Sequence, residues 1–412
     1  MVNIKKLNKI GLGIFALSFL LLTACELEPS DTIDPTASEL LSAESSDKLN
    51  LSDFSTLPEG YENRTDPKLN LGSESARQLE IVLNTHPEYR EMIRKAMDAV
   101  SPSTCGPTDF NFWLDDELEG WDEVIDEFGN TIFDYALIIG MLDFPTYDAL
   151  LFENSSENQY FGVNGEYTQR MTKTFKDLRR FWDIPSDDIV LAAMHGNMLL
   201  DREKVIRIDK ILYGDSQAMA EYYADLTIFL LENFPQYRNG DHPVFTLNAF
   251  ALNGFNFPPY GDIPSKIVMG DGIMEAYEDL GFGDVAPQAI LAHEFAHQIQ
   301  FKLDLFTSPI SDPAEATRRT ELMADAYAAY YLSHARGATM QWKRVQQFLQ
   351  VFFVIGDCGF ASSGHHGTPI QRMAAAEWGY QLADNAKKQG MILSSQEFAD
   401  LFDAQLPILV AP

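Results

Sequence analysis

Residues 284–300 read DVAPQAILAHEFAHQIQ, and this stretch predicts a buried helix. Asp284 can cap the helix, and Pro287 suits its first turn, where a missing amide hydrogen costs no hydrogen bond. Apolar side chains then follow on all sides, which is typical of a helix in a protein interior. His293 and His297 lie four residues apart, so their side chains project from one face, one turn apart.

His293, Glu294 and His297 form the pattern HExxH, and this pattern predicts a metal site. Two neutral imidazoles on one helix face can bind the same Zn²⁺. Glu294 points about 100° away around the helix, so its carboxylate can reach water at the metal without binding the metal itself. A catalytic zinc ion also needs a third protein ligand and an open fourth position.

The third ligand is expected on the next helix. The histidine of an HExxHxxGxxH pattern is absent, because Gln300 and Leu303 stand at its glycine and histidine positions. A helix is predicted within residues 312–337, and it carries Glu321 and Asp325 on one face with small alanines beside them. We expect Glu321 to bind the metal and Asp325 to accept a hydrogen bond from a ligand imidazole. A solvated acidic face is the alternative.

A further motif, HHGTPIQR, occupies residues 365–372. Thr368 and Gln371 form a capping box with a proline at the first helical position, so the histidines precede a helix N-terminus. His366 could there donate a hydrogen bond to the oxyanion that develops on a scissile carbonyl. The alternative is a pair of loop histidines, with Arg372 as a structural partner of a buried acid.

These motifs together resemble one protein family. The patterns AHExxHxxQ at 292–300, ELxADxxA at 321–328 and HGTxxQR at 366–372 are similar to the neutral zinc metallopeptidases of bacteria, which are of gluzincin type. The resemblance covers roughly residues 263–384. The sequence departs from the family in its additional His365, in the two residues before the second histidine of HExxH, and in the long region before residue 241.

The resemblance implies a hydrolase that acts on a peptide or protein with one Zn²⁺ per chain. The implied zinc ligands are His293, His297 and Glu321. Glu294 is the implied catalytic base, and related gluzincins place a histidine in the role suggested for His366. Asp325 and Arg372 are expected to support the ligands from behind. A zinc-binding lipoprotein that captures peptides or proteins without hydrolysing them is the rival hypothesis.

The rest of the chain predicts an α+β fold. Residues 187–200 and 216–234 carry apolar side chains at intervals of three and four, which favours helices. Residues 244–250 and 266–269 are predicted strands on either side of a Pro-Pro-Tyr-Gly turn. We therefore expect a mainly helical, zincin-like domain with a small antiparallel sheet, in which 266–269 is an edge for an extended substrate.

The first 25 residues are predicted to be a signal peptide. Three lysines precede residues 10–22, an apolar run that is too short to span a bilayer comfortably. The run ends in Leu-Thr-Ala-Cys, which resembles the lipobox of bacterial lipoproteins. We expect Cys25 to be lipidated and the protein to be anchored to the membrane on the non-cytoplasmic side of the cell envelope. An ordinary signal peptide is the alternative.

Composition and charge divide the remaining chain. Residues 26–75 hold twelve acids, three bases and two aromatic residues, which predicts a disordered acidic tether. We expect a helical N-terminal region without an assigned role at 76–240, the metallopeptidase domain at 241–390 and a C-terminal segment at 391–412. Without the signal peptide the charge is 27 − 61 = −34. A field of that sign repels phosphate backbones, so nucleic-acid binding is not expected.

Other potentially reactive residues fall outside these motifs. Cys105 and Cys358 are the thiols that remain after lipidation of Cys25. They could form a disulfide in an oxidising compartment, and two buried free thiols are the alternative. His195 and His242 belong to no motif and are interpreted as structural.

Overall fold

The computed structural model describes residues 54, 57–58, 61, 64, 109–307, 310–340, 344, 347, 350, 367–386 and 390–410. All of them belong to one compact unit, Asn50–Pro412. The predicted lipidation at Cys25, the predicted Cys105–Cys358 disulfide and the role suggested for His366 concern residues outside this described part.

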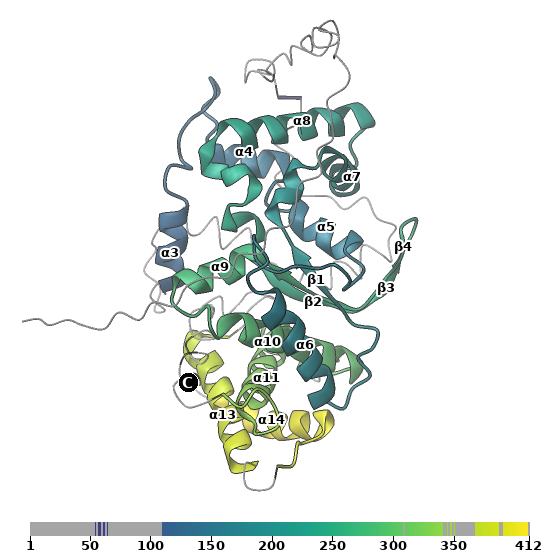
Figure 1. Ribbon diagram of the computed structural model, residues 1–412, viewed down its shortest axis with the longest axis vertical. Helices are drawn as coiled ribbons and strands as arrows, with labels where there is room; N and C mark the ends of the chain where they lie inside the picture. The colour runs from purple at the N-terminus through teal and green to yellow at the C-terminus, as the bar shows by residue number, and fades with distance from the viewer. Residues whose placement is uncertain are drawn as a thin grey trace, which may run out of the picture. The chain divides into compact units, whose positions relative to one another are not determined.

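Helices dominate the described part, together with a few short strands (Figure 1). The α-helices are α3 (Asp109–Glu117), α4 (Ile132–Ile139), α5 (Phe144–Phe152), α6 (Thr168–Phe181), α7 (Arg202–Leu212), α8 (Gln217–Asn233), α9 (Asp271–Asp279), α10 (Ala286–Lys302), α11 (Pro313–Ser333), α13 (Pro369–Ala386) and α14 (Ser395–Leu409). The 3₁₀ helices are η3 (Gly196–Leu200), η4 (Pro235–Gly240) and η5 (Pro243–Thr246). The strands are β1 (Val190–Met194), β2 (Ala249–Leu252), β3 (Phe255–Phe257), β4 (Gly261–Ile263) and β5 (Lys266–Gly270).

A mixed sheet of three strands, in the order β1-β5-β2, lies at the centre of the fold. Strand β5 pairs in parallel with β1, from Val190 opposite Lys266 to Met194 opposite Gly270, and it pairs antiparallel with β2. The expectation of an antiparallel sheet was therefore wrong for β1. The edge role predicted for 266–269 was also wrong, because both sides of β5 carry a neighbouring strand.

Strand β1 was predicted as part of a helix at 187–200. The stretch instead forms β1 followed by η3. Its apolar run is continuous because the strand is buried almost throughout, and such a run cannot be distinguished from a buried helix by its periodicity. A domain boundary was expected between residues 240 and 241. Strand β1 lies before this position and β5 after it, and the two strands are neighbours in one sheet.

The other predicted strands are close to their expected places. Strand β5 matches the prediction, whereas the stretch 244–250 begins as the 3₁₀ helix η5 and becomes strand β2 only at Ala249. Strands β3 and β4 form a separate two-stranded hairpin on either side of the predicted turn. Helix α8 occupies the position predicted for 216–234.

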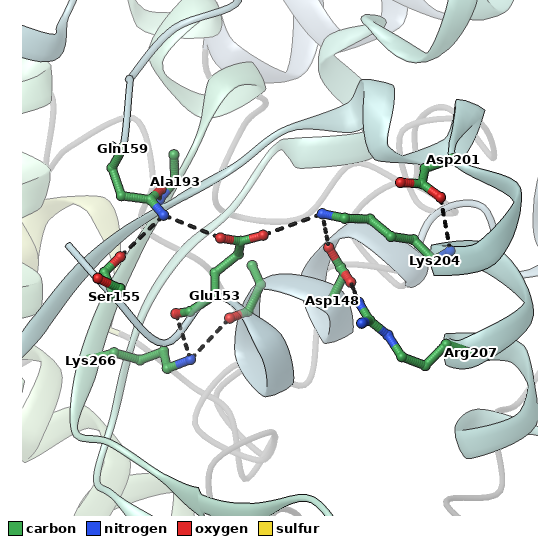
Figure 2. Close-up of polar contacts among 10 residues, drawn as sticks. Asp148, Glu153, Ser155, Gln159, Ala193, Asp201, Lys204, Arg207 and Lys266 are labelled. Atoms are coloured by element: carbon green, nitrogen blue, oxygen red, sulfur yellow. Dashed lines mark hydrogen bonds and ion pairs between the residues drawn. The ribbon is translucent and has the colours of Figure 1, made fainter. Parts of the chain in front are cut away.

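Lys266 opens the central strand, although its side chain is fully buried. Its ammonium group donates to the carbonyl oxygens of Ala149, Leu150 and Glu153 and to the Oδ1 of Asn154, at 2.6–3.1 Å. Figure 2 shows the contact of Lys266 with Glu153. The three carbonyl groups lie at the C-terminal end of α5, where a positive charge is favourable. Burial lowers the pKa of Lys266 to about 7, and the four acceptors stabilise its ammonium form.

The stretch Ile132–Phe152 is long and apolar enough to cross a membrane, yet 78% of its most apolar window is buried inside the protein. It consists of α4 and α5, which are separated at Gly140 by a left-handed turn with φ of 93°. Two short core helices of a compact unit account for the apolar composition.

Helix α11 packs against both α10 and α13 (Figure 1). Gly379 of α13 lies so close to α11 that a Cβ atom there would stand 2.2 Å from the carbonyl oxygen of Ala326. Helix α10 also contacts α6 and strand β2. The HExxH helix is therefore enclosed by helices on one side and by the sheet on the other.

Two residues of the predicted tether at 26–75 are buried in the compact unit. The ring of Phe54 packs 5.5 Å from the rings of both Tyr222 and Phe229 on α8. Arg64 is also buried. The expected disordered tether thus contains two positions whose side chains are buried against the rest of the unit.

Arg64 occupies a cage of rings and carboxylates. Its guanidinium carbon lies 3.9 Å from the ring centroid of Tyr213 and 3.7 Å from that of Tyr223. The guanidinium also pairs with Asp209, at 2.5 Å, and with Asp215. A cation between two rings and two acids balances charges that would otherwise be costly to bury.

Candidate metal centre

The helix that carries HExxH runs from Ala286 to Lys302. Its first turn contains Pro287, as predicted, but the predicted cap is wrong: Val285 precedes the helix and no side chain caps it. Asp284 instead forms ion pairs with Arg170 and Arg344. Packing on all sides keeps this helix in place without a polar cap, since fourteen of its seventeen residues are buried.

Three predicted ligands converge at the contact of α10 with α11. The Nε2 atoms of His293 and His297 lie 3.1 Å apart, and the Glu321 carboxylate oxygens lie 3.3 Å and 3.4 Å from them. A tetrahedral ion with ligand bonds of about 2.0–2.1 Å places neighbouring ligand atoms about 3.3 Å apart. This buried group of two imidazoles and one carboxylate could therefore hold a metal ion.

His293 is oriented by Asp325. Its Nδ1 lies 2.9 Å from Oδ1 of Asp325, which leaves Nε2 turned toward the other ligands. Burial lowers the pKa of His293, but the hydrogen bonds to Asp325 and Glu321 outweigh burial and raise it to about 10. A site that binds a proton this strongly in the absence of a metal attracts positive charge.

Arg372 supports Asp325 from the opposite side. Its Nε and Nη2 donate to the two carboxylate oxygens at 2.8 Å and 2.6 Å. Helix α13 delivers this arginine after the predicted capping box, in which Thr368 and Gln371 exchange hydrogen bonds at 3.1 Å and 3.2 Å. The expected supporting positions of Asp325 and Arg372 thus adjoin the ligand group.

His297 has a different supporting partner. Its Nδ1 lies 2.8 Å from Oε1 of Gln300, and the amide nitrogen of Gln300 donates to the carbonyl oxygen of Thr320 at 2.7 Å. Because Thr320 directly precedes Glu321, this buried glutamine joins the second histidine to the helix that carries the carboxylate ligand. Burial lowers the pKa of His297 to about 4, so its imidazole is neutral and available to a metal at physiological pH.

Glu294 lies beside the ligand group and is buried. Its Oε2 atom has no hydrogen-bond partner among the described residues, while the backbone of Ala251 on β2 hydrogen-bonds the carboxylate. Burial raises the pKa of Glu294 to about 7. A buried carboxylate oxygen without a partner is costly, and water at a bound metal would satisfy it.

The structure therefore brings six predicted site residues together: His293, Glu294, His297, Glu321, Asp325 and Arg372. His366 lies outside the described part, but its neighbour Gly367, at φ of 99°, lies against Leu322 on α11. No role was predicted for Gln300, although it ends the motif AHExxHxxQ. Its position three residues after the second histidine, on the ligand face of the helix, is the signal that could have found it.

Two cavities in the described part, of about 260 Å³ and 670 Å³, are lined by other residues. The metal centre is identified by its donor atoms and their spacing rather than by an open volume. No protein-family model matches the chain, and no curated protein or solved structure matches it either. The functional interpretation therefore depends on the geometry of the site.

Proposed function

We propose that this protein is a zinc-dependent metallopeptidase of gluzincin type. The observation that carries the proposal is the buried convergence of His293, His297 and Glu321 beside Glu294, whose Oε2 has no described partner. Two imidazole nitrogens and a carboxylate form a donor set that suits Zn²⁺. The distance between the nitrogens, and the distance from each nitrogen to its nearer carboxylate oxygen, are compatible with a tetrahedral ion. Bound zinc would polarise a peptide carbonyl and acidify water at the site.

The residues of the chain have distinct roles in this mechanism. Glu294, whose pKa is raised to about 7, is suited to take a proton from water and return it to the leaving amine. Asp325 and Gln300 hold the two imidazoles in the orientation that turns both Nε2 atoms to the metal position. The tightly packed surroundings exclude bulk water, which strengthens these interactions.

Strand β2 is the better candidate for a substrate-binding edge. Within the described residues it pairs with β5 alone, and Ala251 contacts the carboxylate of Glu294. An extended peptide that pairs with this strand would have its backbone next to the catalytic carboxylate. This supports a peptide or protein substrate. The substrate-pairing edge that was expected at 266–269 is then the edge strand β2 instead of the central strand β5.

We also propose that the protein is a lipoprotein of the cell envelope, anchored through Cys25 on the non-cytoplasmic side. The lipobox-like sequence before Cys25 supports this. Replacing Cys25 with serine should abolish labelling by radioactive palmitate and release the protein from membranes. Unchanged labelling of the Cys25→Ser protein would contradict lipidation at this residue.

The decisive experiment is Glu294→Gln, with zinc per chain and hydrolysis of a generic protein substrate as the two measurements. We expect full zinc content, because all three ligands remain, and a loss of turnover of about 10²–10⁴-fold. Glu232→Gln, an exposed change of the same kind on α8, is the matched control and should leave both measurements unchanged.

The possible results separate the proposed function from its rival. If the parent protein binds zinc and cleaves no substrate, the zinc-binding, non-hydrolytic lipoprotein gains support. If Glu294→Gln cleaves as well as the parent, Glu294 is not the base. If the parent binds no zinc, the assignment of the ligands is wrong.

A further inference from the structure

A second histidine–carboxylate pair lies beyond the carboxyl ends of the parallel strands β1 and β5. His195 follows β1 directly, and Asp271 follows β5. The two strands are parallel, with Met194 opposite Gly270, so both side chains emerge at the same edge, where both strands end. In sheets with parallel strands, the region beyond the carboxyl ends of the strands is where ligands commonly bind.

The pair is held in a defined geometry. Nδ1 of His195 lies 2.6 Å from Oδ2 of Asp271, and the other carboxylate oxygen accepts the backbone N–H of Gly162 at 3.0 Å. The imidazole also stacks on Tyr160, with ring centroids 4.0 Å apart and planes inclined by 14°. Asp271 is buried, whereas the His195 side chain remains 18% exposed. The histidine therefore has one edge fixed in the interior and the other edge accessible.

This arrangement determines which ring nitrogen carries the proton. An ionised carboxylate can only accept hydrogen bonds, so Nδ1 of His195 is the donor to Asp271. In the neutral imidazole, Nε2 then carries a lone pair and accepts. No described residue hydrogen-bonds Nε2, and His195 lines a cavity of about 260 Å³. The pair thus presents a hydrogen-bond acceptor to a small cavity.

The cavity is rich in acceptors and negative in charge. Three acids line it, Asp148, Glu153 and Asp201, against a single cation, Lys204. Arg207, which does not line the cavity, also pairs with Asp148 at 2.6 Å, so the charge of these five residues is 2 − 3 = −1. Lys204 is already committed to Asp148 at 2.9 Å and to Glu153 at 3.3 Å, as Figure 2 shows. An anionic ligand would find no uncommitted cation on this wall, whereas a cationic ligand finds a favourable field.

We propose that this cavity binds a small organic cation, a primary amine, whose ammonium group donates a hydrogen bond to Nε2 of His195. Its volume limits the ligand to a molecule of about the size of an amino-acid side chain, since sites for larger organic ligands are about 300–1,000 Å³. The ring of Tyr160 contributes an aromatic wall next to the cation. The proposal does not depend on the metal centre or on peptidase activity.

The test uses three probes of equal chain length: n-butylamine, n-butanol and butyrate. They are titrated into the mature protein, with calorimetry and the imidazole ¹⁵N signals of His195 as readouts. We expect n-butylamine to shift these signals and to bind at least about tenfold more tightly than the other two, as one hydrogen bond with a charged donor allows. Removal of zinc with a chelator should leave this binding unchanged.

Asp271→Asn is the sharpest variant. The N–H of Gly162 requires an acceptor, so the asparagine oxygen stays there and its amide nitrogen faces Nδ1 of His195. The imidazole proton then moves to Nε2, which becomes a donor and can no longer accept from an ammonium group. We expect affinity for n-butylamine to fall at least about tenfold, with a visible change of tautomer in the ¹⁵N spectrum.

Two further variants complete the experiment. Asp225→Asn removes one carboxylate that pairs with Arg202 away from the cavity, and should leave n-butylamine binding unchanged. His195→Phe keeps an aromatic ring against Tyr160 but removes the acceptor, so it should abolish binding of n-butylamine. This variant tests the proposal independently, should Asp271→Asn fail to fold. Tighter binding of butyrate than of n-butylamine, an unshifted His195 signal, or full affinity in His195→Phe would each overturn the proposal.

Discussion

Arg372 donates two hydrogen bonds to the carboxylate of Asp325, from Nε at 2.8 Å and from Nη2 at 2.6 Å. Both side chains are buried, and the same carboxylate orients His293. Helices α10, α11 and α13 therefore meet through one acid, which is shared between a structural ion pair and a ligand of the candidate metal centre. The contribution of Asp325 to stability, through Arg372, and its contribution to metal binding, through His293, can therefore be measured separately.

Asp325→Asn should weaken zinc binding about 10–100-fold, because His293 loses the carboxylate that fixes its orientation and raises its basicity. It should also destabilise the fold, because Arg372 is left buried without its counter-charge. The double change Asp325→Asn with Arg372→Met should recover stability but not zinc affinity. Zinc titration and urea unfolding provide the two measurements. Recovery of zinc affinity in the double variant would contradict a direct role of Asp325.

Gln300→Leu should lower zinc affinity about tenfold, because His297 loses the acceptor that fixes its tautomer and ring orientation. Gln300→Glu should retain more affinity than leucine, since a carboxylate still accepts from Nδ1, although it cannot donate to Thr320. Gln381→Leu, an exposed change on α13, is the control. Competition with a chelator measures all three. Equal affinity for the parent and Gln300→Leu would show that the hydrogen bond is unimportant for the metal.

Arg64→Met should destabilise the protein by about 3–5 kcal/mol, because Asp209 is left buried without its cation. Burial already raises the pKa of Asp209 to about 7. The double change Arg64→Met with Asp209→Asn should restore part of the loss by removing the unpaired charge. Urea unfolding measures the free energy, and limited proteolysis should show faster cleavage near residue 64 in the single variant. An unchanged unfolding midpoint would mean that Arg64 is not anchored.

Stability should fall as the pH drops below about 6.5, partly because of His242. Burial lowers the pKa of this imidazole to about 3, and Nδ1 accepts from the backbone N–H of Val244 while Nε2 lies 3.0 Å from the carbonyl oxygen of Glu117. Between pH 6.5 and 3 the unfolded chain therefore binds a proton that the folded protein does not, so stability is lost as pH falls.

The His242→Asn variant tests this assignment, because asparagine can still accept from Val244 but does not titrate. The unfolding free energy of the variant should vary less between pH 7 and pH 4.5 than that of the parent. Many carboxylates titrate in both proteins, so the difference between the two pH profiles is the measured quantity. Parallel profiles would show that His242 contributes nothing to acid sensitivity.

The candidate metal ligands could be proposed from the sequence because the spacing within each helix is local, although the approach of Glu321 to the two histidines is a tertiary contact. The four-residue spacing of His293 and His297, and of Glu321 and Asp325, fixes each pair on one helix face wherever the helix packs. The capping box of Thr368 and Gln371 is likewise local, and both of its hydrogen bonds form. The buried apolar helix around HExxH follows from composition alone.

Other features depend on partners that are distant in the sequence. The run 190–194 is a strand because β5 lies beside it, and Lys266 is tolerated in the core because the end of α5 supplies its acceptors. Gln300 is held against His297 by its second hydrogen bond, to Thr320 on the next helix, and Arg64 is buried because residues of α7 and α8 surround it. Periodicity determined the faces of helices, whereas tertiary packing decided which buried polar group meets which partner, since that choice depends on contacts across the fold.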